Sequence, residues 1–321
     1  MNSLAGRGPI LITGASGFIG SHLARRLVRG GDLVIGTCTS PVRANRLRDM
    51  PANFILATAD MGNPAALQSL FAAHRFGTVF HLAACGVHEG TAGAADMLSV
   101  NAAGSLNLAQ IALRHRAGCF VYCGSGLEYE SLDAPVCESA ALSAPNLYGA
   151  SKVTGWLLLD YLRRVEGLPL TTVRPFTVFG PAESEHKLIP YAIGRALRRE
   201  PLRLTAGTQI RDYVYVSDVV EALILAAASN TSGAIFNIGA GTSGARTVRQ
   251  IIETTMDLAG APRSLCHFGE ARRSRPDPRH LVANPTRAIN QLGWRPRISL
   301  EEGLLRTIQS MTVSSVSVAA A

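Results

Sequence analysis

The sequence has few charged and few aromatic residues, and it lacks a long hydrophobic run. Charged residues make up 17% and aromatic residues 6% of the 321 residues, whereas hydrophobic residues make up 47%. This composition excludes a disordered chain, which carries more charge and fewer apolar residues. No apolar stretch approaches the roughly 20 residues of a membrane-spanning helix, so we expect a globular protein without a membrane partner.

Metal-binding and export signals are also missing. None of the six cysteines forms a Cys-x-x-Cys pair, and Cys119 and Cys123, four residues apart, have no histidine or acidic residue at ligand spacing. We interpret these two as small core residues and predict no metal site. The N-terminal residues lack the apolar stretch of an export signal, so we expect reduced thiols and a cytoplasmic protein.

Positive charge exceeds negative charge, with a formal net charge of +8 and a pI of about 9.5. The arginines and lysines are scattered apart from a cluster at 263–279, and no helix-turn-helix, zinc or RNA-binding signature accompanies them. We therefore expect no nucleic-acid partner. A small polyanion, such as a dinucleotide or a nucleotide sugar, suffices to explain the basic bias.

Apolar strands alternate with helical stretches in the first half of the chain. The predicted strands are 9–13, 32–37, 53–57, 78–83, 118–123 and 169–174, and the predicted helices are 18–30, 64–75, 93–116 and 146–166. Because the strands are continuous apolar runs, we expect both faces of the sheet to be covered. The pattern predicts an α/β fold with a Rossmann-type, doubly wound parallel sheet.

The rhythm changes after Pro175. The predicted helices there are 187–199, 217–229, 247–260, 285–292 and 300–311, and the predicted strands are 202–205, 212–216 and 234–238. We predict that 1–175 and 212–240 form the sheet domain. The rest divides into a smaller, discontinuous C-terminal substrate-binding lobe, 176–211 and 241–311, and a flexible tail, 312–321.

A glycine-rich segment joins the first predicted strand to the first predicted helix. Residues 10–20 read ILITGASGFIG, with Gly14, Gly17 and Gly20 three apart. Gly14 permits a sharp turn, Gly17 lets the backbone approach a pyrophosphate, and Gly20 lets the helix pack closely on the strand. An ordinary glycine-rich turn is the alternative. The position at the first strand–helix junction favours a dinucleotide site whose phosphates face the helix N-terminus.

The end of the second predicted strand bears on the choice of cofactor. An acidic residue there accepts hydrogen bonds from the ribose hydroxyls of NAD, but residues 37–40 read TCTS, and Arg43 and Arg46 follow. Hydroxyl and guanidinium groups, Thr39 and Arg43 among them, suit a 2′-phosphate, so NADP(H) is preferred over NAD(H). Solvated loop arginines are the alternative. Asp60 is a candidate for the adenine amine or for a helix cap.

Ser125, Tyr148 and Lys152 are the candidate catalytic residues. Tyr148 and Lys152 stand four residues apart in a predicted helix and so share one face. We expect the ammonium to lower the pKa of the phenol, which then exchanges protons near neutral pH. Ser125 ends the preceding predicted strand, where its hydroxyl can orient a substrate oxygen. For the pair alone, a solvated helix face is the alternative.

Together these segments resemble the extended short-chain dehydrogenase/reductases over roughly residues 9–311. The matching segments are TGASGFIG at 13–20, HLAA at 81–84, Asn101 in NAAGS, Ser125, the Tyr148/Lys152 pair, RPFTVFGP at 174–181 and RDYVYVSDVV at 211–220. The resemblance implies NAD(P) binding and a nucleotide-sugar substrate. It implies Tyr148 as acid/base, Lys152 as its helper and Ser125 as the oxygen-orienting donor. It also implies a homodimer formed through the helices at 93–116 and 146–166.

The resemblance further implies which residues surround the two ligands. For the cofactor they are Gly14, Ser16, Gly17, Phe18, Ile19, Gly20, Thr39, Arg43, Asp60, Met61, Leu82, Ala83, Ala84, Asn101, Tyr148, Lys152 and Pro175. For the substrate they are His88, Ser125, Gly126, Thr177, Lys187, Arg211 and Arg275. Arg211 and Arg275 are the candidates for the phosphates, because a guanidinium fork suits a pyrophosphate.

The residues after Ser125 narrow the reaction. Nucleotide-sugar 4,6-dehydratases of this family carry an Asp-Glu or Ser-Glu pair directly after the Ser/Thr, where this chain has Gly126 and Leu127. Leucine cannot transfer a proton, so the dehydratase reaction is disfavoured. Glu128 follows, but its side chain would point to the opposite face of an extended segment.

GSGLEY at 124–129, VIGT at 34–37, the RPF-x-x-x-GP segment and the C-terminal region most resemble GDP-4-keto-6-deoxymannose reductases. We therefore predict an NADPH-dependent reductase of a nucleotide 4-keto-6-deoxy-sugar, with Tyr148 as proton donor. Thr177 stands where those enzymes have Asn, and the second strand lacks their following Arg. An NAD-dependent nucleotide-sugar 4-epimerase is thus the alternative. A non-catalytic dinucleotide-sensing protein is a third possibility, which the presence of both Tyr148 and Lys152 disfavours.

Overall fold

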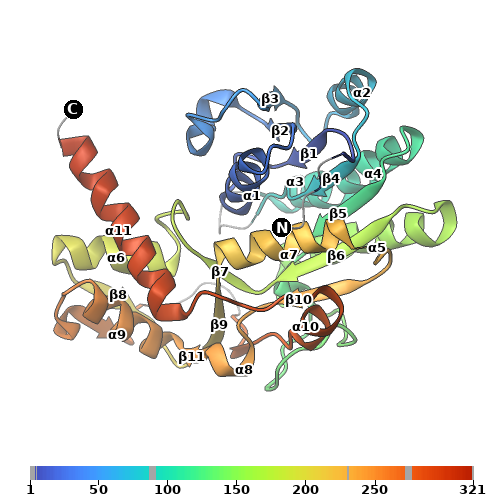
Figure 1. Ribbon diagram of the computed structural model, residues 1–321. Helices are drawn as coiled ribbons and strands as arrows, with labels where there is room; N and C mark the ends of the chain where they lie inside the picture. Colours follow the sequence, from blue (N-terminus) through green and yellow to red (C-terminus); the bar gives the residue numbers. More distant parts are fainter. Residues whose placement is uncertain (1–3, 5, 87–91, 230, 272–276, 320–321) are drawn as a thin grey trace.

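A parallel sheet lies at the centre of the first part of the molecule (Figure 1). The computed structural model describes residues 4, 6–86, 92–229, 231–271 and 277–319. Within these residues the sheet has seven strands in the order β10-β6-β5-β4-β1-β2-β3, and all neighbours are parallel. The strands are β1 Ile10–Thr13, β2 Val34–Cys38, β3 Phe54–Thr58, β4 Thr78–His81, β5 Cys119–Cys123, β6 Leu170–Pro175 and β10 Ile235–Ile238. The predicted Rossmann-type sheet is confirmed.

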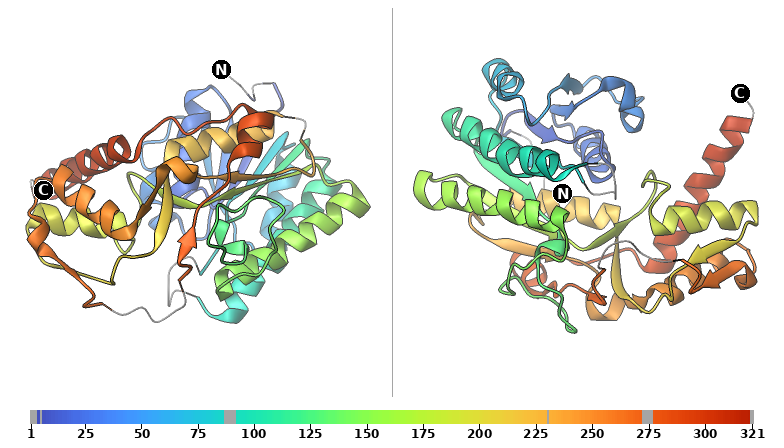
Figure 2. Two further views of the ribbon diagram at one scale, coloured as in Figure 1. Left: turned by 90° about the horizontal axis from the view of Figure 1, so that it is seen from below. Right: turned by 180° about the vertical axis from the view of Figure 1, so that it is seen from behind.

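Helices cover both faces of this sheet (Figures 1 and 2). On one face lie α1 (Phe18–Arg29) and α7 (Val216–Ala228), and on the other lie α2 (Pro64–Ala73), α4 (Gly104–Arg114) and α5 (Leu147–Glu166). Strands β1, β2, β4, β5 and β6 are buried at every residue, as continuous apolar runs predict. The strand order reverses between β1 and β4, and ligands of such sheets bind at the carboxyl ends of the strands beside this point.

The predicted helix 93–116 is interrupted. Instead of one helix, the chain forms α3 (Ala94–Leu98), a π-helical turn η3 (Ser99–Ala103) and α4. A π-turn widens the helix and breaks its 3.6-residue period locally, often at a functional site. Asn101 lies in this turn, so the interruption falls on a residue that we predicted to face the cofactor.

The second part of the chain contributes a smaller sheet and its own helices. β9 (Ile210–Tyr215) pairs with β7 (Thr177–Phe179), β11 (Ala245–Thr247) and β13 (His280–Leu281), while β8 (Leu202–Leu204) pairs with β12 (Cys266–Phe268). The helices are α6 Leu188–Arg198, α8 Gly241–Gly244, α9 Val248–Leu258, α10 Thr286–Leu292 and α11 Leu300–Ala319. Short 3-10 turns are η1 Pro41–Arg43, η2 Asn45–Leu47, η4 Gly126–Glu128 and η5 Arg263–Leu265. The predicted domain boundary between residues 211 and 212 falls inside β9, which belongs to the smaller sheet.

The last helix is longer than predicted. We predicted an end at residue 311 and a frayed tail from Thr312, but α11 continues to Ala319. The β-branched and serine residues there are poor helix formers. The hydroxyl of Thr312 donates to the carbonyl of Ile308 one turn earlier, so this side chain joins the helix instead of competing with it. No helix among the described residues is long and apolar enough to cross a membrane.

Candidate active site

The glycine loop joins β1 to α1 at the carboxyl edge of the large sheet. Gly14 has a φ of +70°, and a Cβ there would lie 2.8 Å from the backbone of Ala83. A Cβ on Gly20 would lie 2.3 Å from the carbonyl oxygen of Gly14. Helix α1 begins with Gly17 as its N-cap, so its first N–H groups receive no side-chain cap. These features fit the pyrophosphate of a dinucleotide, whose charge an uncapped helix N-terminus stabilises.

Two predicted cofactor residues at the start of α1, Phe18 and Ile19, use their side chains for packing. Phe18 and Ile19 pack against the cluster that contains Phe179 and Ile193, so their side chains join α1 to the second part of the chain. What they can offer a dinucleotide is their backbone N–H groups. Ser16 has its carbonyl 3.4 Å from the guanidinium of Arg46, which also donates to the carbonyl of Ala182 at 2.7 Å.

The end of β2 presents hydroxyl and basic groups beside this loop. Thr39 is exposed. Arg46 is held next to the glycine loop by the two carbonyls named above. Of Arg43 only the backbone, in η1, is described. Asp60 does not cap α2. Its carboxylate accepts the N–H of Gly62 at 2.8 Å, whereas Asn63 is the N-cap of α2. The helix-cap alternative for Asp60 is therefore wrong.

A buried hydrogen-bond chain supports the segment after β4. The hydroxyl of Thr13 lies 2.7 Å from Nδ1 of His81, Nε2 of His81 lies 2.8 Å from the hydroxyl of Ser105, and Ser105 donates to the carbonyl of Asn101. Because Ser105 uses its proton on that carbonyl, His81 must donate through Nε2 and accept from Thr13. Burial lowers the pKa of His81 to about 3, so the imidazole stays neutral. Thr13 also accepts the N–H of Ala83, which fixes the predicted cofactor segment of Leu82, Ala83 and Ala84.

Asn101 braces this segment against α5. Its amide exchanges two hydrogen bonds with the backbone of Cys85, at 2.9 and 3.0 Å, and donates to the hydroxyl of Ser151 at 2.9 Å. Ser151 in turn donates to the carbonyl of Tyr148. A Cβ on Gly155 would lie 2.2 Å from the carbonyl of Asn101, so α5 packs closely on the π-turn. Met61, also predicted at the cofactor, is buried beneath Gly104.

Ser125, Tyr148 and Lys152 meet at the carboxyl end of β5. Ser125 caps η4, because its hydroxyl accepts the N–H of Leu127 at 3.2 Å. Tyr148 lies in the first turn of α5, and Lys152 lies one turn later. The ammonium of Lys152 donates to the carbonyl of Cys123 at 2.8 Å, two residues before Ser125. These contacts place all three predicted catalytic residues at one edge of the sheet.

The electrostatics of the pair differ from the prediction. Burial raises the pKa of Tyr148, and the neighbouring Cys123, Glu128 and Cys85 raise it further. Burial lowers the pKa of Lys152, whose side chain is 1% exposed. The expected lowering of the phenol pKa is therefore wrong for the chain alone, because Lys152 bonds to a carbonyl and burial opposes the phenolate. Tyr148 keeps its proton at neutral pH and is set up to donate it.

Glu128 is the residue that sequence reasoning misplaced. We expected its side chain on the opposite face of an extended segment, but η4 turns the carboxylate back under Ser125. Oε1 accepts the N–H of Ser125 at 2.7 Å, and Oε2 pairs with Nε of Arg174 at 2.7 Å. The two side chains are 0% and 1% exposed. An Asn, Ser or Thr three residues before a Glu is the signal that indicates such a turn, and SGLE at 125–128 contains it.

Three of the predicted substrate residues, Thr177, Lys187 and Arg211, lie in the second part of the chain. Thr177 begins β7, and its hydroxyl is buried without a hydrogen-bond partner among the described residues. Lys187 is the N-cap of α6. Gly126 lies against the ring of Phe176. Pro175, which we predicted at the cofactor, ends β6. His88 and Arg275 lie outside the described residues.

Arg211, a candidate for the substrate phosphates, is largely enclosed. Its side chain is 7% exposed and pairs with Asp277 at 2.8 Å. It also donates to the carbonyls of Ile210 and Pro278, both at 2.7 Å. A phosphate contact through this guanidinium therefore requires a partner to be exchanged or a remaining donor to be used.

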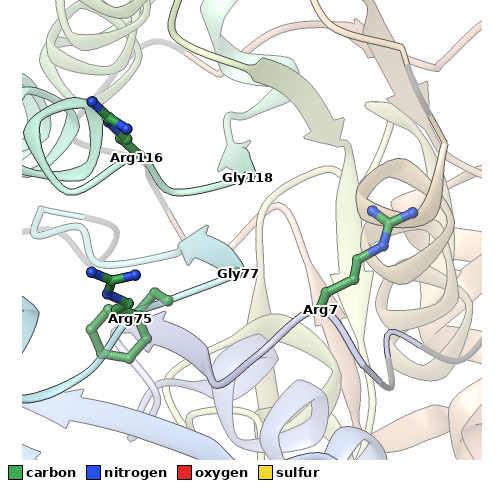
Figure 3. A pocket seen from close by; sticks show the side chains of 6 residues that line it. Arg7, Arg75, Gly77, Arg116 and Gly118 are labelled. Carbon is green, nitrogen blue, oxygen red and sulfur yellow. The ribbon is translucent and has the colours of Figure 1, made fainter.

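A hollow of about 470 Å³ lies at the opposite end of the sheet, where β4 and β5 begin. Arg7, Arg75 and Arg116 line it with Gly77 and Gly118 (Figure 3). The guanidinium of Arg7 donates hydrogen bonds to the carbonyls of Ala227 and Ala228 at the end of α7. This hollow is separate from the Ser125 edge. Among the described residues no group of three or more His, Cys, Asp or Glu side chains could hold a metal ion.

Comparison with known proteins agrees with this geometry. The model of the "NAD dependent epimerase/dehydratase family" matches residues 10–239. A UDP-glucose 4-epimerase of Mycolicibacterium smegmatis is 31% identical over 93% of this chain and 97% of its own length. A dTDP-glucose 4,6-dehydratase of an Actinoplanes species is 28% identical over 93% of this chain and 96% of its own length.

Solved structures give the same result. DesIV, a dTDP-glucose 4,6-dehydratase of Streptomyces venezuelae solved with NAD and TYD bound, has a TM-score of 0.87 at 26% identity and covers 96% of this chain and 98% of its own. The predicted resemblance to a family of dinucleotide-binding enzymes is thus confirmed. The matches named above are a 4-epimerase and two 4,6-dehydratases, so they do not specifically support the finer resemblance to GDP-4-keto-6-deoxymannose reductases. The chain is an enzyme of the NAD-dependent epimerase/dehydratase family.

Proposed function

We propose that this enzyme is a nucleotide-sugar 4-epimerase that works through Ser125, Tyr148 and Lys152. The observation that carries the proposal is the absence of a usable carboxylate after Ser125 within the described site. Gly126 and Leu127 occupy the positions in question, and Glu128 is 0% exposed and committed to Arg174. Loss of water from a sugar needs an acid or base there. Beside a nicotinamide that would take and return the hydride, oxidation and reduction at carbon 4 need from the protein only the phenol, the ammonium and the serine hydroxyl.

The residues would share the work as follows. A bound nicotinamide supplies hydride transfer to and from carbon 4 of the sugar. Ser125 orients the oxygen on that carbon, and Tyr148 removes or returns the proton of that oxygen. Lys152 fixes the site through the carbonyl of Cys123 and is placed to favour the phenolate when a ligand fills the cleft. The curated relatives named as 4-epimerases, at about 30% identity, support this reaction.

The test is the fate of a nucleotide sugar. UDP-glucose and dTDP-glucose would each be incubated with the purified enzyme, and the product analysed by NMR for inversion at carbon 4. We expect the 4-epimer without net change in cofactor oxidation state. A 4-keto-6-deoxy product would instead identify a dehydratase and overturn the proposal.

A second candidate is the NADPH-dependent 4-keto reductase, and two observations favour it. The raised pKa of Tyr148 suits a proton donor, and the end of β2 offers Thr39 and Arg46 instead of a carboxylate. NADP(H) preference belongs to this candidate, with the 2′-phosphate contacting these side chains. The dinucleotide released on denaturing the purified enzyme separates the two: tightly held NAD supports the epimerase, whereas an empty site selective for NADPH supports the reductase.

The pH profile separates the same two reactions. An epimerase needs the phenolate of Tyr148 for its first step, so its turnover should rise with pH above neutrality. A reductase needs the protonated phenol, so its turnover should hold through neutral pH and fall only at high pH. Both directions follow from the raised pKa of Tyr148.

We further propose that the enzyme forms a homodimer through α5 and its neighbour α3. Leu157, Tyr161 and Val165 follow one another at four-residue spacing on α5, and each is at least half exposed, while Leu98 on α3 is 46% exposed. A second copy would cover this apolar stripe. Light scattering should give twice the chain mass, and Tyr161→Glu should give monomers. A monomeric wild-type enzyme would refute the dimer.

The substrate lobe is also a proposal. Residues 176–211 and 241–311 would bind the nucleotide sugar, with the unpartnered hydroxyl of Thr177 available for a hydrogen bond. Lys187, Arg211, His88 and Arg275 are further candidates for the same ligand. Alanine substitutions of these residues should raise KM more than they lower kcat.

A further inference from the structure

A buried polar chain runs from Ser125 into the protein. Glu128 accepts the N–H of Ser125 and pairs with Arg174, whose Nη1 donates to the hydroxyl of Tyr129 at 2.8 Å. Tyr129 donates to the amide oxygen of Asn237 at 2.8 Å, and Asn237 donates to the carbonyl of Val136. The chain thus links the end of β5 to β10, two strands away in the sheet.

The local sequence leaves room for this carboxylate. A Cβ on Gly124 would lie 2.5 Å from Oε1 of Glu128 and 3.0 Å from Cγ of Arg174. The guanidinium of Arg174 lies 4.7 Å from the ring centre of Tyr129 and 4.9 Å from that of Trp156. Two aromatic rings and a glycine therefore enclose the pair, which keeps water away from it.

The same turn also contacts the start of α5. A Cβ on Gly149 would lie 2.1 Å from the carbonyl oxygen of Leu127, so η4 packs directly on the residue after Tyr148. Any movement of η4 consequently shifts Ser125 relative to the first turn of α5. The carboxylate of Glu128 is the group that holds η4, because it bonds the N–H at the beginning of the turn.

We propose that Glu128 and Arg174 are positioning residues: they fix the Ser125 hydroxyl relative to Tyr148, so that both meet the same substrate oxygen. Neither side chain reaches solvent, and Glu128 acts through the backbone of Ser125. The expected loss of kcat rests on the proposed oxidation and reduction at carbon 4, whereas the positioning of Ser125 by Glu128 does not. The alternative is a pair that merely stabilises the fold.

A double-mutant cycle distinguishes these roles. Glu128→Gln keeps the shape, but its single oxygen cannot accept from both Arg174 and the N–H of Ser125. We expect the oxygen to face the charged guanidinium, so the bond to the N–H of Ser125 is the one lost. We expect kcat to fall by roughly 10- to 100-fold, the scale on which small misplacements act, with a smaller change in KM. In a Ser125→Ala background the same change should lower kcat by less than about 2-fold, because Glu128 acts through Ser125.

Two further variants protect the test against simple unfolding. Asp218→Asn is the matched control, because this buried carboxylate likewise accepts backbone N–H groups, but from Arg297 and Ile298 and not from Ser125. Both N–H groups donate to one oxygen, which the amide can supply, so this variant should fold and should not lower kcat. Gly124→Ala is a milder perturbation that displaces the carboxylate of Glu128 without leaving an unpaired charge, and it should lower kcat in the same direction.

Hydrogen exchange separates failure of this proposal from failure of the proposed function. In Glu128→Gln, the amide of Ser125 should take up deuterium faster, while amides around Asp218 should not change. Unchanged exchange at Ser125 overturns the proposal whatever the enzyme turns over. Faster exchange with an equal loss of kcat in the Ser125→Ala background reduces the pair to a structural role. If the wild-type enzyme converts no nucleotide sugar, the proposed function fails, and the catalytic part of this proposal fails with it.

Discussion

Two arginine–carboxylate pairs lie on the two sheets, and they differ in access to water. Arg174 and Glu128, at the carboxyl edge of the large sheet, are 1% and 0% exposed, whereas Arg211 and Asp277, on the smaller sheet, are 7% and 19% exposed. The first pair lies between a turn and two aromatic rings. The second lies beside the backbone carbonyls of Ile210 and Pro278.

The difference separates two tasks. A fully enclosed ion pair cannot exchange its partner for a ligand without a large desolvation cost, so Arg174 can only hold structure in place. A pair at the rim can exchange a carboxylate for a phosphate, since both partners can be rehydrated on the way. Under the proposed function, the large-sheet edge would carry the reacting groups on a rigid support, and the smaller sheet would carry groups that can respond to substrate.

The largest expected effect compares the two arginines directly. Arg174→Ala leaves Glu128 buried and uncompensated, so the free energy of unfolding should fall by about 3–5 kcal/mol. Arg211→Ala leaves Asp277 partly exposed, so the loss should be clearly smaller. Urea unfolding of both variants measures this. Equal losses in the free energy of unfolding would mean that the Arg174–Glu128 and Arg211–Asp277 pairs do not differ in the way that their exposed fractions suggest.

The second prediction concerns catalysis at the large-sheet edge. Tyr148→Phe should lower turnover by about 10²-fold or more, the usual scale for a lost general acid, with little change in melting temperature. Arg211→Ala should act mainly on KM. Steady-state kinetics on the converted nucleotide sugar measures both. Near-normal turnover of Tyr148→Phe would exclude this phenol from the mechanism.

The third prediction concerns glycines in the two regions. A methyl group at Gly20 would meet the backbone of Gly14 and Ala15, whereas one at Gly194 in α6 would meet only the flexible end of Arg198, at 3.4 Å. Overpacking of this kind costs about 1–3 kcal/mol, so Gly20→Ala should weaken dinucleotide binding about ten-fold or more. Gly194→Ala should bind normally. Titration calorimetry with NAD and NADPH gives the comparison, and equal affinities would contradict the role of the loop.

Local patterns predicted much of the first region. The glycine loop, the apolar strands and the positions of Ser125, Tyr148 and Lys152 each depend on neighbouring residues, because turns, burial and helix faces have short-range signatures. The features that the sequence analysis did not predict in this region depend on tertiary contacts. The π-turn around Asn101 follows from close packing on Gly155, and helix periodicity cannot reveal it.

The second region was harder to predict for the same reason. The partner of Arg211 lies 66 residues further on at Asp277, and no local pattern indicates it. The boundary predicted between residues 211 and 212 falls inside β9, a strand that pairs with β7, β11 and β13, which are far apart in sequence. Glu128 is the instructive exception: its place was missed although the capping sequence was present, because the segment was taken as extended.

The last prediction concerns the pH dependence that Asp212 on β9 contributes. Its Oδ2 accepts the N–H groups of Gly241 and Ala283, while Oδ1 is buried without a hydrogen-bond partner among the described residues. Burial raises the pKa of this carboxyl from 3.8 to about 7. Between these values the folded protein keeps a proton that the unfolded chain releases. This group therefore makes the free energy of unfolding fall as pH rises through that window, by at most about 1.4 kcal/mol per pH unit.

Asp212→Asn tests this directly. The amide oxygen can keep both backbone N–H bonds, and its NH₂ replaces the oxygen that lacks a partner, so the variant should fold. Other carboxyls titrate in the same range, Glu183 among them, whose pKa burial raises to about 8. The informative quantity is therefore the difference between wild type and variant in urea unfolding at several pH values from 4 to 7. That difference should grow in favour of the variant as pH rises. Parallel curves would mean that Asp212 ionises normally and that the smaller sheet is hydrated at this point.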